Sequence, residues 1–281
     1  AGNQSVAACS GSITVNMSAV TLSLADPTTS SQSYARQPTV SVTIANDAGA
    51  TKWCVSEIQT TKPATGVSSC TGGQGATSGW HSARPATFDL SGGDGAKTVY
   101  IWTSDVLDNV GTIAVNDAII LDTAPPVNPT VAVSDPSSGS TAVTNESPAT
   151  LAITLDTGAQ RWCVIELAGA AAAPAQPAWN DVCFVTPRPT TVAMGAQGQR
   201  KVYVYTKDFA ENVSASYGMA TIIFDSVVPT NPTGWTLSSP ANGTISNDGT
   251  PIVSGTAIVG EDGSSVIVFD NPTCTLQAVV N

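Results

Sequence analysis

The chain has 281 residues, only 11% of them charged, and a formal net charge of −11. Its ten basic residues are scattered, so a phosphate backbone would be repelled and nucleic acid is excluded as a partner. No apolar run approaches the length needed to cross a bilayer, so we expect no membrane insertion.

Landmark residues recur about one hundred positions apart. Asp105 and Asp122 return as Asp208 and Asp225, a shift of 103 residues in both cases (208 − 105 and 225 − 122). Asp-Pro pairs at 26–27 and 135–136 precede Trp-Cys pairs at 53–54 and 162–163 by the same spacing. A repeat of this length is the size of a domain, so the chain is predicted to be a string of similar domains.

The thirteen-residue step from Asn109 to Asp122 also separates Asn3 from Asn16. We therefore expect residues 1–16 to be the last strand of a preceding or partner-completed repeat. The complete repeats are predicted at 17–122 and 123–225, with a partial repeat at 226–281. On this division the chain is either a window from a longer protein or is completed at its ends by neighbouring chains.

Short stretches alternate between apolar and polar residues, which is the pattern of strands with one buried face. They lie at 20–24, 40–44, 99–102, 113–115, 119–121, 151–155, 202–205 and 221–224. About seven short strands per repeat predict an all-β fold of tandem antiparallel β-sandwiches. In a strand neighbouring side chains point to opposite faces, so each Trp-Cys pair should place one residue inward and the other outward. The Ala-rich stretch 168–174 contains Gly and ends at Pro, which favours a loop.

Four of the six cysteines follow the repeat. Cys54 and Cys70 lie in one copy and Cys163 and Cys183 in the next, 16 and 20 residues apart. The spacing and the single histidine argue against zinc, so two disulfides and an oxidising compartment are predicted. Four buried free thiols are the alternative.

The remaining cysteines, Cys9 and Cys274, fall in the two incomplete end pieces. Each is expected to pair with a cysteine outside this stretch, or Cys9 of one chain with Cys274 of another.

Three motifs carry a resemblance to a known family. Residues 93–100 read GDGAKTVY, residues 105–109 read DVLDN, and residues 120–126 read ILDTAPP. This order resembles the bacterial immunoglobulin-like repeats of very large surface and adhesin-type proteins, although Asp108 and Glu211 stand where those repeats often have Gly. Residues 251–257, PIVSGTA, look like the start of a related adhesin repeat. The resemblance implies immunoglobulin-like sandwiches at the bacterial cell surface.

The repeats are joined by short segments that contain Pro, which predicts an extended, semi-rigid rod. Carboxylates cluster in sequence near these joints, and related repeats can bind calcium there. Calcium prefers carboxylate and carbonyl oxygens. The candidate ligands are Asp105, Asp108, Asp122, Asp208, Glu211 and Asp225. The alternative is that these residues serve turns and solubility.

No catalytic motif occurs, and the only histidine, His81, has no counterpart in the second repeat, so we expect no enzyme and no cofactor other than the candidate calcium. The leading interpretation is a stalk or spacer of an extracellular adhesin, with neighbouring repeats or identical chains as partners and an unknown ligand at its tip. One alternative is a filament or sheath subunit assembled head to tail by strand donation. The other is an accessory carbohydrate-binding module that uses Trp80, Trp102 or Trp235.

Overall fold

The computed structural model describes residues 20–64, 70–71, 79–112 and 114–228, together with the strands at 233–239 and 252–256. Every regular element among these residues is a β-strand, and none is a helix that could span a bilayer. The chain divides into two compact units, Ala1–Phe224 and Asp225–Asn281. In the second unit, β17 (Thr233–Ser239) pairs antiparallel with β18 (Ile252–Thr256).

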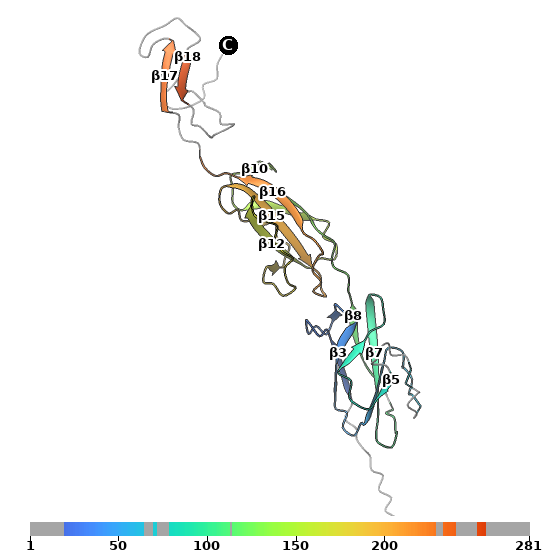
Figure 1. Cartoon of the computed structure of the whole chain (residues 1–281). Coiled ribbons are helices and arrows are strands. Elements are labelled where there is room, and N and C mark those ends of the chain that lie inside the picture. Colours follow the sequence, from blue (N-terminus) through green and yellow to red (C-terminus); the bar gives the residue numbers. More distant parts are fainter. Residues whose placement is uncertain are drawn as a thin grey trace, which may run out of the picture. The chain divides into compact units, whose positions relative to one another are not determined.

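The first sandwich packs a three-stranded sheet against a five-stranded sheet (Figure 1). The three-stranded sheet has the order β1-β3-β6, and the five-stranded sheet has the order β2-β8-β7-β4-β5. The strands are β1 (Thr21–Ala25), β2 (Tyr34–Ala35), β3 (Thr39–Ala45), β4 (Lys52–Ser56), β5 (Gly79–His81), β6 (Thr87–Asp89), β7 (Gly95–Ser104) and β8 (Val115–Leu121).

The second sandwich repeats this arrangement strand for strand (Figure 1). Its sheets have the orders β9-β11-β14 and β10-β16-β15-β12-β13. The strands are β9 (Thr130–Ser134), β10 (Val143–Thr144), β11 (Ala149–Thr154), β12 (Arg161–Ala168), β13 (Phe184–Val185), β14 (Thr191–Val192), β15 (Gly198–Lys207) and β16 (Gly218–Phe224).

Both sandwiches have the strand order of an immunoglobulin-like fold. With the short segments β2 and β10 set aside, the first, second and fifth strands form one sheet and the third, fourth, sixth and seventh form the other. A short second segment, β2 or β10, crosses over and pairs parallel with the last strand. All other pairings in the two sandwiches are antiparallel. The prediction of tandem all-β sandwiches is confirmed.

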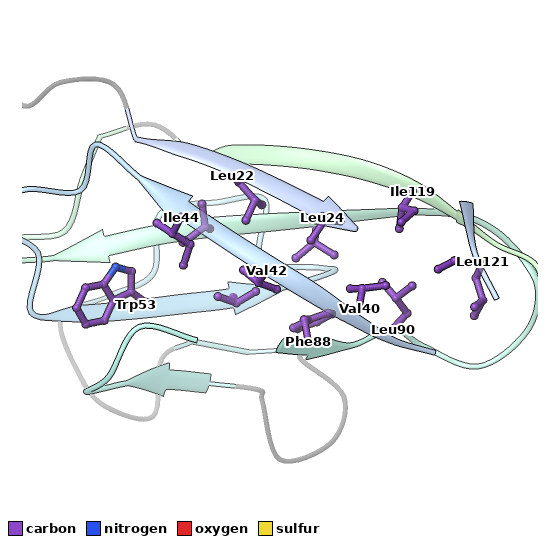
Figure 2. Close-up of a cluster of buried hydrophobic side chains, with 14 residues drawn as sticks. Leu22, Leu24, Val40, Val42, Ile44, Trp53, Phe88, Leu90, Ile119 and Leu121 are labelled. Carbon is purple, nitrogen blue, oxygen red and sulfur yellow. The ribbon is translucent and has the colours of Figure 1, made fainter. Parts of the chain in front are cut away.

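The first core lies between the two sheets and is formed by the alternating apolar residues of both (Figure 2). Trp53 lies at one end of this core and Leu121 at the other (Figure 2). Trp53 points into the core, whereas its neighbour Cys54 faces the outer side of the five-stranded sheet, in a second cluster with Trp102. The second sandwich has the same division, with Trp162 against the core and Cys163 on the outer side. The alternation expected of the Trp-Cys pairs is therefore confirmed.

One local expectation was wrong. The stretches 113–115 and 119–121 were predicted as separate strands, but a single strand, β8, runs from Val115 to Leu121, because its alternation continues through 117. His81 ends β5 and pairs with Trp53 across the sheet. Of the Ala-rich stretch 168–174, which was predicted as a loop, Ala168 ends β12 and residues 169–174 form a loop.

Candidate functional site

Each sandwich carries one disulfide on the outer face of its five-stranded sheet. Cys54 is bonded to Cys70 and Cys163 to Cys183, with Cα atoms 5.8 Å and 4.9 Å apart. Both distances lie in the range that a disulfide requires. The two pairings predicted from sequence are confirmed, and each fastens a long loop over the sheet.

Aromatic side chains at equivalent places tie the same loops down by hydrogen bonds. Trp102 Nε1 donates to the carbonyl of Gln59 at 2.8 Å, and Tyr205 Oη donates to the carbonyl of Pro174 at 3.2 Å. Trp102 is only 4% exposed, so the suggestion that it stacks on sugar is wrong. Trp80 packs against the Cys54 cluster, and the side chain of Trp235 lies outside the described residues.

A Trp-Asp-Arg cluster occurs in both sandwiches and was missed in the sequence; its Trp and Asp are buried in the first sandwich and partly buried in the second, and both arginines are exposed. Trp53 Nε1 donates to Asp47 Oδ2 at 2.7 Å, and Arg84 binds the same carboxylate through Nε and Nη2. In the second sandwich Trp162 donates to Asp156 at 2.8 Å, and Arg188 pairs with that carboxylate. The available signal was that both aspartates precede their tryptophan by six residues.

The Asp-x-x-x-Asn turns after β7 and β15 fold in the same way. Asp105 accepts hydrogen bonds from the backbone and side-chain nitrogens of Asn109, at 2.8 Å and 2.9 Å. Asp208 accepts the matching pair from Asn212, at 2.8 Å and 3.1 Å. The fourth residue of each turn has a positive φ, 63° at Asp108 and 69° at Glu211. Glycine adopts such a backbone conformation without steric cost, so both positions would accept it.

The two turns differ in what covers them. In the second turn, Asn212 Nδ2 also donates to the backbone carbonyl of Asp122, the residue after β8, at 2.8 Å. Beside it, Phe209 stacks on Tyr34 of β2, with ring centroids 5.5 Å apart and an angle of 14° between the planes. We call this contact of 208–212 with Asp122 and Tyr34 the joint; it ties the second sandwich to the end of the first at which β8 leaves.

Two hydrogen bonds hold the segment that connects the sandwiches against the second sandwich. Thr206 Oγ1 donates to the carbonyl of Val127 at 3.4 Å, and Asn128 Oδ1 accepts from the amide of Ser216 at 2.9 Å. The linker is therefore held by the second sandwich as well as stiffened by Pro125 and Pro126.

The pKa of the aspartate is shifted in opposite directions in the two turns. In the uncovered turn, the hydrogen bonds from Asn109 lower the pKa of Asp105. In the joint, burial raises the pKa of Asp208, and the nearby charge of Asp122 adds to that increase, against the lowering effect of Asn212. The two pKa shifts therefore differ in direction because desolvation is the largest influence only on the more deeply buried Asp208.

A hollow of about 240 Å³ beside the joint contains charges that neutralise one another. Glu211 pairs with the buried ammonium of Lys207 and with Arg161. Lys207 Nζ also donates to the carbonyl of Trp179 at 2.7 Å and lies over the ring of Phe184. This hollow offers no paired nucleophile and base of the kind that catalysis needs.

The six candidate calcium ligands are each engaged by nearby donors in the structure. Asp108 pairs with Lys52, while Asp122 and Asp225 accept from the amides of Ala124 and Val227 in short turns. Asp105, Asp208 and Glu211 are held as described above. Within the described ranges, no three acidic, histidine or cysteine side chains gather into a group that could hold a metal ion. Calcium binding stays a prediction, and the arrangement accounts for these carboxylates through turns and ion pairs.

Cys9 and Cys274 lie outside the described residues.

No family model and no curated protein matches this chain. Matching solved structures include the fibronectin(III)-like modules of CbhA from Clostridium thermocellum, 13% identical, covering 75% of this chain and 97% of that one at a TM-score of 0.41. A likeness at that TM-score carries no argument. The assignment to immunoglobulin-like sandwiches therefore rests on the strand order itself.

Proposed function

We propose that this chain is a non-enzymatic structural segment of an extracellular bacterial surface protein, in which it acts as a stalk or spacer. The observation that carries the proposal is the joint. A hydrogen bond from Asn212 and an aromatic stack of Phe209 on Tyr34 fix the start of one sandwich to the exit of the one before it. A spacer needs such contacts, because a free linker would let the domains swing and would lose reach.

The disulfides support an extracellular location. Two cystines, one per repeat, persist only in an oxidising compartment such as a cell surface. Each closes a loop of 16 or 20 residues, and by loop-closure entropy each contributes about 3 kcal/mol of stability. A module stapled in this way suits a segment that must withstand the medium and mechanical load.

The test uses the whole chain in small-angle X-ray scattering coupled to size exclusion, with Asn212→Ala combined with Phe209→Ser to break the joint. We expect the wild type to be monomeric with a narrow distribution of maximum dimension, and the double variant to show a broader distribution. The matched control is Asn109→Ala combined with Val106→Ser in the uncovered turn, which should leave the profile of the monomer unchanged.

Three other outcomes would argue against the spacer function. Equal profiles for the wild type and the joint variant would contradict it. Long polymers at micromolar concentration would favour a filament subunit, and retention by insoluble polysaccharide would favour a carbohydrate-binding module. Repeating the scattering with calcium and then with chelator tests the candidate calcium ligands, since a bound ion at the joint would make the profile depend on calcium.

A further inference from the structure

The turn at 105–109 has the same conformation as the turn in the joint, but among the described residues it has no covering contact of the kind that the joint makes. Both turns make the same hydrogen bonds between Asp and Asn and end in the same isolated bridge to the preceding strand. In the joint, Asp208 and Asn212 are each 6% exposed and the tip residue Ala210 is 2% exposed. At the equivalent tip of the first turn, Val106 and Leu107 are 79% and 78% exposed.

Two adjacent apolar side chains at this exposure form an apolar surface that takes no part in the turn itself, whose hydrogen bonds are made by Asp105 and Asn109. The shift of 103 residues sets Val106 against Phe209, whose ring stacks on Tyr34 although the side chain is still 58% exposed. Leu107 corresponds in the same way to the buried Ala210. The first turn thus presents apolar surface at the positions that the joint uses for contact.

Asn109 also has a donor to spare. Its Nδ2 donates one hydrogen to Asp105, and within the described part of the chain its second hydrogen is not used in a hydrogen bond. In the joint, Asn212 Nδ2 makes the corresponding bond to Asp208 and gives its other hydrogen to the carbonyl of Asp122. The donor that reaches across the joint is therefore present, and similarly oriented, in the first turn.

The turn is also at the correct end of the sandwich for such a contact. Leu121, the last residue of β8, and Trp53 lie at opposite ends of the core (Figure 2). Lys52, next to Trp53, pairs with Asp108 of the turn. The 105–109 turn therefore lies at the end away from the exit strand, where a preceding sandwich would arrive.

From this equivalence we infer that the 105–109 turn is the docking surface for the exit end of a preceding immunoglobulin-like sandwich of the same repeat. The occupant presents a backbone carbonyl at the position of Asp122 for Asn109, and an apolar residue at the position of Tyr34 for Val106 and Leu107. The exit end of the second sandwich has the same character, with Val143 at the place of Tyr34. The inference rests on the proposed spacer function and deepens it, because it makes the joint a repeated contact.

The test keeps the whole chain and lengthens it by a second copy of residues 17–122, inserted ahead of residue 17. Hydrogen exchange with mass-spectrometric readout is then measured for peptides covering 105–109 and 208–212 in the original and lengthened chains. We expect exchange in the 105–109 turn of the downstream copy to slow by about tenfold or more, which corresponds to ~1.4 kcal/mol of added protection. The same turn in the upstream copy should exchange as it does in the original chain.

Side-chain variants provide the second readout. Leu107→Ser should leave the original chain unchanged, but in the downstream copy of the lengthened chain it should return exchange to the uncovered rate. Unchanged exchange in the downstream turn, with protection at 208–212 intact, would overturn this inference alone. Fast exchange at 208–212 as well would overturn the proposed function with it. If the added sandwich does not fold, a copy of residues 123–225 inserted at the same point replaces it, and its exit end must give the same protection.

Discussion

Replacing Asp47 by Ala should destabilise the first sandwich because it leaves a buried indole nitrogen without a partner. Trp53 is 8% exposed and Asp47 6% exposed, and the bond between them is 2.7 Å long. A hydrogen bond to a charged group contributes about 1.5–3 kcal/mol. Arg84, whose side chain is 53% exposed, adds at most about 1 kcal/mol because solvent screens it. We expect a loss of about 2–4 kcal/mol in the free energy of unfolding.

Thermal unfolding of the whole chain, followed by calorimetry, measures this loss. The two sandwiches form separate cores, so the second sandwich serves as an internal reference whose transition should not move. The transition of the first sandwich should fall by on the order of 10–15 °C. Asp156→Ala, the matched variant, should shift the other transition instead, and by less, because Asp156 and Trp162 are less completely buried.

A double-mutant cycle decides whether the bond to Trp53 is the cause. In a Trp53→Phe background the donor is gone, so Asp47→Ala should cost only the share of Arg84, about 1 kcal/mol or less. Asp47→Asn keeps an acceptor for the indole and should recover much of the loss. If the effects of Asp47→Ala and Trp53→Phe are simply additive, or if Asn behaves like Ala, the reasoning is refuted.

Replacing Cys54 by Ala should lower the unfolding free energy of the first sandwich by about 3 kcal/mol. Reducing the disulfide of the wild type should lower it by the same amount. A smaller effect of reduction would show that the loss comes from packing and not from the crosslink. Hydrogen bonds from Ser138 and Thr144 lower the pKa of Asp135 to about 2. Its stabilisation is therefore fully present above the unfolded value of about 3.9 and is lost as the pH falls to about 2, so denaturation of wild type and Asp135→Asn should converge across that window and not above pH 5. Replacing Asp108 by Gly relieves a positive φ and loses only an exposed ion pair, so the free energy of unfolding measured by denaturant titration should change by less than about 1 kcal/mol. Replacing Glu211 by Gly removes the carboxylate that pairs with the buried ammonium of Lys207, so the free energy of unfolding should fall by about 2–4 kcal/mol. Equal effects of the two substitutions would contradict the role of burial.

Most of the fold could be predicted from local patterns. Alternation placed the long strands, the repeat gave two sandwiches, and the Trp-Cys pairs predicted both cystines. These features depend on residues that are close in sequence, or that recur at a fixed step, because strand geometry and turn conformation are set by short stretches of chain. The positive φ of Asp108 and Glu211 was not predicted and became visible only in the structure.

For the candidate carboxylates the sequence left two interpretations open, calcium ligands or residues that serve turns and solubility. Sequence placed six of them near the joints and suggested calcium, whereas the structure gives each one a donor in a turn or ion pair within the described residues. Asp47 and Asp156, which were not singled out, are the carboxylates that accept hydrogen bonds from the core tryptophans. Proximity in sequence to a linker did not reveal which oxygen atoms were already satisfied.

The sequence by itself determined that residues 105–109 and 208–212 form the same turn, since both carry Asp and Asn four positions apart after a matching strand. Only the tertiary structure decided that one turn is buried in a joint, with the pKa of its aspartate raised, while the other holds two apolar side chains in solvent. The physical reason is that hydrogen bonds within a turn are local, whereas desolvation depends on what packs against it from a distant part of the chain.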